Sequence, residues 1–579
     1  MICLIRLPAV ESFRFATTNI CMPLGLAYIA AALEEAGHKV QVLDAVGEAP
    51  EEHTNCYKGY LIGLNLDELV RRIPKEAVKV GISVIFTHEW PILVALVERI
   101  KIQRPDLPII LGGEHITSMP EFCLLTSKSD YLVLGEGEET IVELVAALDN
   151  NSSLDVIDGI AYRKDGLAVV NRRRARQRDI DAIHLPSWKH FKISTYHEHR
   201  FVGGMFSSEI TMPILATRGC PYQCTYCSAP NMWTTRWVAR DPIKVVDEIE
   251  SYVHTYGARN FPFQDMTAII RRSWIVAFCQ ELISRDLGIT WQLASGTRSE
   301  AIDETVADLL YRSGMTSMSY APESGSESTR RFIKKRMQTE ALFSSIDAAS
   351  KASLNVAAFL VIGFPHDKAE HMRENLPFVD QVARSGITDL SIGFFVAMPG
   401  TELFANLFDT GKIKLDREYF RHILASLSLI PGQSHSLHLS KLELSLWKLR
   451  LILRFYNEKS QNNSSGEGFF KLLKNLTVGL FSKSKHQSKL QTAFRNGITT
   501  GLESIRSQFG PRWIPAREER EMFVAWDGIF RHIRQEKLRL KVIAPSLADS
   551  TDLHRHNVAP LLRKEHGSSH SIGLETIDS

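Results

Sequence analysis

A chain of 579 residues is too long for one ordinary hydrophobic core, so we expect two or three domains. Its 68 basic and 66 acidic residues leave a formal charge of +2, which gives no electrostatic reason to expect a nucleic-acid partner. The longest apolar runs, such as residues 24–33, are shorter than the ~20 residues of a membrane-spanning helix. The first residues also lack the basic and apolar segments of a secretory signal. We therefore expect a cytoplasmic protein without a membrane span.

Residues 1–150 alternate short β-branched apolar runs with helical patterns, which predicts an α/β domain built on a doubly wound parallel sheet. The expected strands are residues 2–7, 40–44, 78–86, 108–111 and 130–134. The expected helices are residues 23–36, 66–77, 90–104 and 139–149. Ligands of such sheets bind beyond the carboxyl ends of the strands. The glycine pair Gly112-Gly113 follows one such end and would let a bulky ligand approach the backbone, although a plain strand-to-helix turn is the alternative.

Residues 151–210 form a predicted linker, with a strand pair near 159–170. After it come three cysteines, Cys220, Cys224 and Cys227, in the spacing CxxxCxxC. Three thiolates this close suit one iron–sulfur cubane and leave its fourth iron without a protein ligand. The alternatives are a zinc knuckle, which would need a fourth ligand at short range, and a redox CxxC pair. The other five cysteines are scattered singly, and we expect each to be a small buried apolar residue, as free cysteine usually is.

Strand-and-helix alternation continues over residues 211–402 and predicts six barrel strands. They are expected at residues 214–217, 261–265, 290–295, 317–321, 356–362 and 390–396. Polar residues follow three of these strands, as the active groups of such barrels do. They are Gln264 and Asp265, residues 295–298, and residues 323–326. The alternative for Asp265 and Glu323 is that each simply caps the following helix.

The C-terminal third, residues 403–543, is predicted to be helical because apolar periodicity is strong over residues 442–455 and 522–533. Residues 471–506 are rich in lysine and arginine. That pattern fits either a solvated helix on the barrel or contact with a membrane surface. Residues 544–579 are polar with little apolar content, and we expect them to be disordered.

The cysteine run, with Tyr226 before its third cysteine, resembles the motif of the radical S-adenosylmethionine (SAM) superfamily. The resemblance implies a partial (β/α)6 barrel whose Cys220, Cys224 and Cys227 hold a [4Fe–4S] cluster, with SAM chelating the open iron. It further implies that the amino acid and adenosine parts of SAM contact a set of residues around the barrel mouth. That set is Tyr226, Asp265, Ser295, Arg298, Glu323 and Gly363. Phe359 replaces the first glycine of the superfamily pattern G-x-I-x-G, of which Gly363 is the second.

The N-terminal segment resembles the cobalamin-binding domain that precedes many radical SAM barrels. The resemblance is carried by residues 23–28, 112–117 and 135–138. It implies cobalamin contacts at Leu24, Gly25, Ser83, Gly112, Gly113, Glu136 and Gly137. The family motif D-x-H-x-x-G is absent from residues 8–22, so we expect no histidine of the chain to ligate cobalt there. We expect His115 to be a polar loop residue and not a ligand.

Together these resemblances imply a cobalamin-dependent radical SAM methyltransferase that methylates an unactivated carbon or a phosphorus of a small-molecule substrate. The runner-up is an oxidative cyclase similar to the anaerobic magnesium-protoporphyrin monomethyl ester cyclase. A third hypothesis is a non-enzymatic cobalamin or redox sensor. Reductive SAM cleavage would also require an electron donor such as flavodoxin or ferredoxin. The sequence assigns no further catalytic residue.

Overall fold

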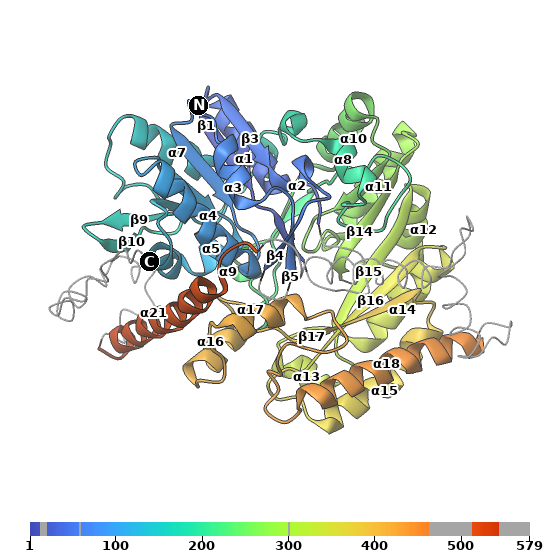
Figure 1. The fold of residues 1–579 in the computed structure, drawn as a ribbon. Helices are drawn as coiled ribbons and strands as arrows, with labels where there is room; N and C mark the ends of the chain where they lie inside the picture. The colour runs from blue at the N-terminus through green and yellow to red at the C-terminus, as the bar shows by residue number, and fades with distance from the viewer. Residues whose placement is uncertain (12–19, 57–58, 299–300, 463–511, 544–579) are drawn as a thin grey trace.

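The structure, a computed structural model, describes residues 1–11, 20–56, 59–298, 301–462 and 512–543. Two α/β units lie side by side, with the C-terminal helices along one edge of both (Figure 1). The α/β fold class and the order of a sheet domain, a barrel-like domain and a helical region are confirmed.

The N-terminal sheet has seven strands in the order β10-β9-β8-β7-β6-β1-β3. Its parallel part comprises β1 (Ile2–Arg6), β3 (Val40–Asp44), β6 (Lys79–Ser83), β7 (Ile109–Gly112) and β8 (Tyr131–Val133). The chain starts at β1, next to the edge strand β3, and adds strands on both sides of β1, so the doubly wound prediction is confirmed. The predicted strand pair near 159–170 is also present. It forms β9 (Ile160–Lys164) and β10 (Leu167–Val170), which extend the sheet antiparallel to β8.

Helices cover both faces of this sheet. On one face, α1 (Leu24–Glu35) and α7 (Glu138–Asp149) bury side chains such as Leu26 and Leu144. On the other face, α3 (Leu66–Arg72) and α4 (Trp90–Gln103) bury Leu69 and Leu96. The helix predicted to reach residue 77 ends at Arg72, because the residue before a proline is pushed out of helical geometry and Pro74 follows Ile73.

A small three-stranded sheet beside this domain was not predicted. It comprises β2 (Ala9–Glu11), β4 (His53–Cys56) and β5 (Gly59–Ile62) in the order β2-β5-β4. The strands have three or four residues each, and β4 reads His-Thr-Asn-Cys without alternating apolar positions. Such strands give no recognisable period in the sequence.

The second sheet is parallel and contains five strands in chain order. They are β13 (Asn260–Phe263), β14 (Thr290–Thr297), β15 (Met315–Glu323), β16 (Asn355–Ile362) and β17 (Asp389–Phe394). The helices α10 (Pro242–Tyr256), α11 (Arg272–Arg285), α12 (Glu304–Arg312), α14 (Thr339–Lys351) and α15 (Ala369–Arg384) alternate with them.

The first of the six predicted barrel strands, at residues 214–217, is not a full strand. Thr211 and Ile214 make isolated parallel bridges to Asn260 and Phe263 of β13. Pro213 lies between them and has no N–H to donate to a ladder. The chain then turns away as β11 (Thr217–Arg218), which pairs antiparallel with β12 (Val238–Ala239). The barrel therefore opens with a bridged segment followed by five strands.

The C-terminal region is helical, as its apolar periodicity predicts. Its described helices are α16 (Glu402–Asp409), α17 (Arg417–Leu424), α18 (Lys441–Asn462) and α21 (Ala516–Ile543). In Figure 1, α18 runs beside α15, and Arg454 of α18 forms an ion pair with Asp380 of α15. α21 packs on the N-terminal domain, where Phe530 meets the edge of Phe122 with ring centroids 5.7 Å apart.

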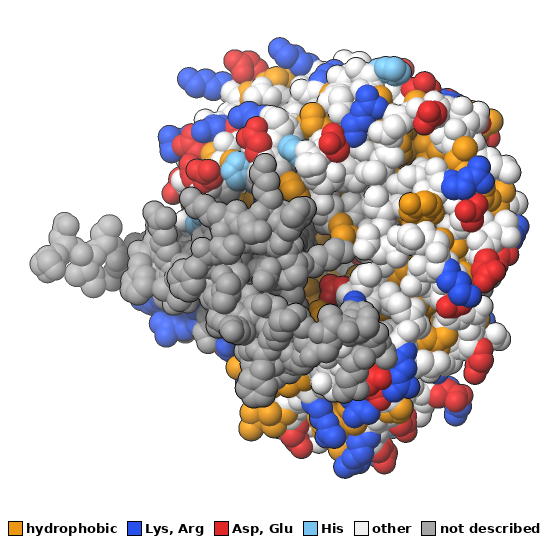
Figure 2. Space-filling view, turned by 90° about the vertical axis from the view of Figure 1, so that its right-hand side faces the viewer, with side chains coloured by type: hydrophobic (Ala, Val, Ile, Leu, Met, Phe, Trp, Pro, Cys, Tyr) orange, Lys and Arg blue, Asp and Glu red, His pale blue; other side chains and the backbone are white. Residues whose placement is uncertain are grey.

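Two predictions on this part of the chain, the basic stretch 471–506 and the disordered tail 544–579, lie outside the described residues. Among the described helices, none is long and apolar enough to cross a membrane. On the face shown in Figure 2, acidic and basic side chains are interspersed over the described surface, in keeping with the nearly balanced charge of the sequence.

Candidate active site

The three cysteines of the CxxxCxxC run lie on the loop between β11 and α9 (Ala229–Trp233). All three thiols are free and half-buried. The backbone of Thr225 holds this loop in place, because its N–H donates to the Ile333 carbonyl at 3.1 Å and its carbonyl accepts the Leu403 N–H at 3.1 Å. The loop is thus fixed to segments more than 100 residues further along the chain, and it presents its cysteines at the mouth of the barrel.

Residues on both sides of the cysteines bind the N-terminal domain. Arg218, before the run, forms ion pairs with Glu138 at 2.6 Å and with Glu136 at 3.2 Å. Ser228, after the run, donates a hydrogen bond to Glu114. Glu114 follows β7, and the other two glutamates follow β8, so all three belong to the carboxyl edge of the N-terminal sheet. The cysteine loop therefore lies against the edge where such sheets bind ligands.

Arg218 is almost completely buried in this contact. Its guanidinium lies between the rings of Tyr28 and Trp233, with centroid distances of 5.2 and 5.7 Å. Burial acts to raise the pKa of Glu138, but the charge and hydrogen bond of Arg218 outweigh it and leave that pKa lowered. Arg218 could not be singled out from the sequence, because a single arginine before a glycine carries no recognisable motif.

Asp265, which follows β13, is 2% exposed and is bonded to the chain leading into the cysteine loop. Its carboxylate accepts the Ala216 N–H at 3.1 Å and the Thr217 hydroxyl at 2.6 Å, together with the Thr217 N–H. Burial raises the pKa of Asp265 to about 6, against the opposing effect of these hydrogen bonds. The alternative role as a helix cap is not what the structure shows, since Asp265 instead fixes the backbone before Arg218. Its contact with SAM stays a prediction.

Tyr226 and Glu323, which are both predicted SAM contacts, are hydrogen-bonded to each other. The Tyr226 hydroxyl donates to Glu323 at 2.7 Å, and Lys335 forms an ion pair with the same carboxylate at 3.1 Å. Glu323 ends β15 with φ of +64°, a backbone conformation that residues other than glycine adopt rarely and at a cost in conformational energy. The Tyr226 ring meets Phe364 at a centroid distance of 5.7 Å. These contacts tie the cysteine loop to the ends of β15 and β16.

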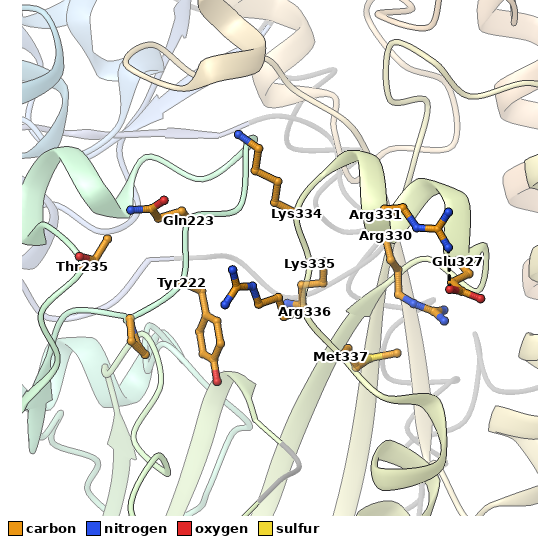
Figure 3. A pocket seen from close by; sticks show the side chains of 11 residues that line it. Tyr222, Gln223, Thr235, Glu327, Arg330, Arg331, Lys334, Lys335, Arg336 and Met337 are labelled. Carbon is orange, nitrogen blue, oxygen red and sulfur yellow. Dashed lines mark hydrogen bonds and ion pairs between the residues drawn. The ribbon is translucent and has the colours of Figure 1, made fainter.

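A pocket of about 620 Å³ opens beside the cysteine loop (Figure 3). Residues of the loop and of the segment after β15 line it: Pro221, Tyr222, Gln223, Thr235, Glu327, Arg330, Arg331, Lys334, Lys335, Arg336 and Met337. Five of these side chains are cationic and one is acidic. One of the predicted residues contacts its lining, because Arg298 has its guanidinium 3.9 Å from the Tyr222 ring centroid. Ser295 is exposed at a bulge in β14, and its contact with SAM stays a prediction. The pocket suits an anionic group.

Gly363 lies at the end of β16, where its N–H donates to Asp367 at 2.9 Å. A side chain at this position would meet Leu444 of α18 at 3.0 Å. Its local contacts are thus with the turn after β16 and with α18, and its neighbour Phe364 makes the contact with Tyr226.

The residues predicted to contact cobalamin fall along or near the carboxyl edge of the N-terminal sheet. Ser83 ends β6, Gly112 ends β7, and Gly137 precedes α7. Leu24 and Gly25 begin α1, and nothing lies within 4 Å of the position that a Cβ of Gly25 would take. Glu136 forms ion pairs with Arg176 at 2.6 Å and with Arg218, so its carboxylate joins the N-terminal domain to the segments that follow it.

Gly113 must be glycine for a reason that does not depend on a ligand. Its φ is +122°, and a Cβ there would lie 2.2 Å from the carbonyl oxygen of Val84. The close approach of two backbone segments therefore requires glycine, whether or not a ligand is near.

The expectation that His115 is a polar loop residue is wrong. His115 lies in the short helix α5 (Glu114–Ser118) and is 2% exposed, packed against Trp90 with ring centroids 5.2 Å apart. Burial lowers its pKa to about 3, so the ring is neutral. Its nitrogen Nδ1 lies 3.2 Å from the Thr87 hydroxyl. The glycine pair before it gave the sequence a loop-like appearance, although the chain enters a helix at once.

Two families of known proteins match the chain in the same order as these two units. The B12 binding domain matches residues 15–145, and the radical SAM superfamily matches residues 214–379. The chain contains a B12-binding domain followed by a radical SAM domain. The resemblance to these two families, predicted from the cysteine run and the glycine-rich loops, is thus confirmed.

Similar proteins support the same assignment. The chain is 28% identical over 452 residues to cytidylyl-2-hydroxyethylphosphonate methyltransferase of Streptomyces wedmorensis, covering 72% of this chain and 83% of that protein. It is 29% identical over 312 residues to the anaerobic magnesium-protoporphyrin IX monomethyl ester cyclase of Rubrivivax gelatinosus, covering 53% and 54%. The solved structure of the cobalamin-dependent SAM radical enzyme OxsB shares the fold, with a TM-score of 0.61 at 15% identity, covering 96% of this chain and 82% of that one.

The cysteines of the radical SAM domain fit a cluster better than a single zinc ion. Zinc would hold three thiolates about 3.8 Å apart, since Zn–S bonds are about 2.3 Å long. Metal sites of this kind need three ligand atoms of His, Cys, Asp or Glu close to one another. Among the described residues, one such set lies within 4.8 Å, and it consists of two histidines and an aspartate elsewhere in the barrel. That set does not include the three cysteines, whose CxxxCxxC spacing suits an iron–sulfur cubane.

The carboxyl edge of the N-terminal sheet fits a large, partly apolar cofactor. Ile85 and Phe86, just after β6, are each 44% exposed, which is unusual for two adjacent apolar side chains on a loop. Glu89 shapes this turn by accepting the N–H groups of Ile85 at 3.2 Å and Phe86 at 3.0 Å. Exposed apolar side chains at this edge suit contact with the apolar parts of such a cofactor.

Proposed function

We propose that this protein is a cobalamin-dependent radical SAM methyltransferase that methylates an unactivated carbon or a phosphorus of a small-molecule substrate. The observation that carries the proposal is the contact between Arg218 and Ser228 on one side and Glu114, Glu136 and Glu138 on the other. These contacts hold the cysteine loop against the carboxyl edge of the B12-binding sheet. A methyl carrier at that edge and a SAM molecule at the cysteine loop would face one shared space.

When bound, the [4Fe–4S] cluster supplies the electron that cleaves SAM, and cobalamin supplies a methyl carrier. The chain's own residues position and shield these groups. Asp265 fixes the backbone of Ala216 and Thr217 ahead of the cysteines. Tyr226, Glu323 and Lys335 form a bonded set at the barrel mouth that offers a carboxylate and a hydroxyl to the ribose and adenine of SAM.

The cationic pocket beside the loop supports an anionic group on one of the bound molecules. Arg331, Lys334 and Lys335 each form an ion pair with a glutamate. Arg330 donates to two neutral acceptors, the Ser324 carbonyl and the Thr339 hydroxyl, while the charges of Glu327 and Glu340 act on it without a direct hydrogen bond among the described residues. A carboxylate, phosphate or phosphonate would pair with it. The similar Streptomyces enzyme is named for a cytidylyl phosphonate, which is such an anion.

The electron donor and the compartment belong to the same proposal. Reductive SAM cleavage consumes one electron, and a small redox protein such as flavodoxin or ferredoxin is the class of donor that supplies it. All eight cysteines are free, which is typical of proteins in a reducing compartment such as the cytoplasm.

One experiment tests the proposal. The protein, reconstituted anaerobically, is given cobalamin, a reductant and SAM with a labelled methyl group. We expect 5′-deoxyadenosine, S-adenosylhomocysteine and transfer of the label to cobalamin. Deoxyadenosine without label transfer would favour an oxidative cyclase, the activity for which the Rubrivivax relative is named. If neither product forms although the cluster is intact, the radical SAM function itself is wrong.

A further inference from the structure

A cluster of potential metal ligands lies on the turn between β16 and α15, away from the three cysteines. His366, Asp367 and His371 each offer one ligand atom, and these atoms lie within 4.8 Å of one another. His366 Nε2 is 3.9 Å and His371 Nδ1 is 3.8 Å from the same oxygen, Oδ1 of Asp367. The two imidazole rings face this carboxylate with their centroids 5.1 Å apart.

The ring nitrogens of His366 lack hydrogen-bond partners in the described part of the chain, although its side chain is 21% exposed. Both of its ring nitrogens are buried, and neither has a hydrogen-bond partner among the described atoms. The ring is held by stacking on Phe332, with a centroid distance of 3.9 Å. A buried polar group without a partner costs about 1–3 kcal/mol, so native proteins rarely leave one. A cation between His366 and Asp367 would supply the missing partner.

Asp367 is held rigidly and keeps capacity for a cation. Its carboxylate is fully buried and accepts the N–H groups of Gly363 and Phe364, each at 2.9 Å, on Oδ2. On Oδ1 it accepts the Thr329 hydroxyl at 3.1 Å. Each carboxylate oxygen has about two acceptor positions, so Oδ1 retains one. Fixed hydrogen bonds of this kind orient carboxylate ligands in metal sites.

His371 and His438 complete the surroundings. Nδ1 of His371 accepts the Lys368 N–H at 3.2 Å, a long hydrogen bond that a metal ion would replace. His438 is close enough for its charge to act on His366. It lies next to a loop that is bonded to the turn, because the Ser436 hydroxyl donates to the Asp367 carbonyl at 2.8 Å. His438 or a water molecule could therefore serve as the fourth ligand.

We propose that this turn binds one divalent first-row transition-metal ion, with His366, Asp367 and His371 as its protein ligands. Two imidazole nitrogens and one carboxylate oxygen are a donor set that Zn²⁺ accepts. Tetrahedral zinc with bonds of about 2.0–2.1 Å would place its ligand atoms about 3.4 Å apart. The observed separations of 3.8 and 3.9 Å need to shorten by only about 0.5 Å.

The ion would stiffen the barrel mouth. It would join the turn after β16 to α13 (Glu327–Phe332), which supplies Phe332 and Thr329. The same turn carries Phe364, which contacts Tyr226 of the cysteine run. The alternative is that Asp367 closes the turn by its hydrogen bonds alone and that the two histidines are unrelated neighbours.

The test uses the full chain with its iron–sulfur cluster reconstituted and cobalamin omitted, so that the cysteines are already occupied. The protein is dialysed against a chelator and titrated with Zn²⁺, and bound zinc is measured by mass spectrometry. We expect about one zinc per chain in the wild type, and a loss of zinc affinity of about tenfold or more in His366→Ala and His371→Ala. His254→Ala, at a histidine that is 73% exposed on α10, is the matched control and is expected to bind zinc like the wild type.

X-ray absorption of the zinc-loaded wild type is the second measurement and does not depend on whether the variants fold. Nitrogen and oxygen neighbours without sulfur are expected. Sulfur neighbours, absence of stoichiometric zinc, or equal zinc affinity in folded His366→Ala would overturn the proposal. SAM cleavage measured on the same samples reports on the proposed function separately, because the cysteines and this turn hold different ions.

Discussion

Arg218 and Glu138 form a 2.6 Å ion pair although they lie 80 residues apart in the chain. Both side chains are nearly buried, with exposed fractions of 5% and 13%. Arg218 lies two residues before Cys220, and Glu138 begins α7 at the carboxyl edge of the B12-binding sheet. The pair therefore fixes the cysteine loop to the sheet that faces it.

Arg218→Met is expected to destabilise the protein by about 3–5 kcal/mol, because removing one partner of a buried ion pair leaves the other charge uncompensated. Urea unfolding under anaerobic conditions measures the free energy. The same variant is expected to lower label transfer from SAM to cobalamin more than it lowers 5′-deoxyadenosine formation, since the loop keeps its cysteines but loses its fixed position.

The control for this variant is Arg172→Gln. Arg172 pairs with Asp158 at 2.6 Å, but its side chain is 66% exposed. Exposed pairs contribute about 0–1 kcal/mol, so the unfolding free energy should hardly change. An equal loss of unfolding free energy in the two variants would show that the buried Arg218 ion pair stabilises the protein no more than an exposed one.

Cys224→Ala is expected to abolish the cluster and all SAM cleavage, because only two thiolates would remain to hold four irons. Iron content and 5′-deoxyadenosine yield are the measurements. Cys279→Ala is the matched control, since Cys279 is fully buried in α11 and packs among apolar side chains. It should keep iron and activity at a modest cost in stability. Iron retained at the wild-type level in Cys224→Ala would contradict the site.

Asp265 makes the stability of the protein depend on pH in a defined direction. Burial raises its pKa in the folded protein to about 6, above its ordinary value of 3.8. A carboxyl group with a raised folded pKa contributes stability that is fully present below pH 3.8 and is lost as the pH rises through about 6. Between pH 5 and 7.5 the unfolding free energy of the wild type should therefore fall relative to that of Asp265→Asn, whose side chain does not titrate. Parallel pH profiles for the two proteins would contradict the raised pKa.

The fold was predictable wherever a residue pattern reports local structure. The parallel strands were recognised from β-branched runs, and the cysteine loop from its spacing. The first barrel strand is shorter than predicted because residues 214–217 are apolar enough for a strand, while the turn of the chain toward β12 depends on pairing with a segment about 20 residues further on. Contacts between domains, such as Arg218 with Glu136, leave no pattern, because neither residue is unusual in its own surroundings. His115 was misjudged for the same reason, since its burial depends on Trp90 and on the distant Trp526, which packs against Trp90.

Tyr226 offers two contacts that substitutions can separate. Tyr226→Phe removes the hydrogen bond to Glu323 but keeps the ring on Phe364. Because Lys335 still pairs with Glu323, the cost should be about 0.5–1.5 kcal/mol, and SAM cleavage should persist. Tyr226→Ala removes the ring as well and should cost about 3–5 kcal/mol with loss of SAM cleavage. Unfolding and 5′-deoxyadenosine assays distinguish the two variants. Equal activity in both would remove Tyr226 from the SAM site.

Gly113 and Gly25 are both predicted cobalamin contacts, but the structure gives them different reasons to be glycine. Gly113→Ala should destabilise the protein by about 2–4 kcal/mol even without cobalamin, since its φ of +122° and the 2.2 Å approach to Val84 leave no room for a Cβ.

Gly25 lies in α1 with open space around it. Gly25→Ala should stabilise the cobalamin-free protein by about 0.5–1 kcal/mol, because alanine is the better helix former. If the open space belongs to cobalamin, the same methyl group should weaken cobalamin binding about fivefold or more. Gly528→Ala is the control, because Gly528 also has nothing within 4 Å but lies in α21. It should give the same gain in stability with unchanged cobalamin affinity, measured by absorbance titration. Equal cobalamin affinity in the two variants would place the cofactor away from the start of α1.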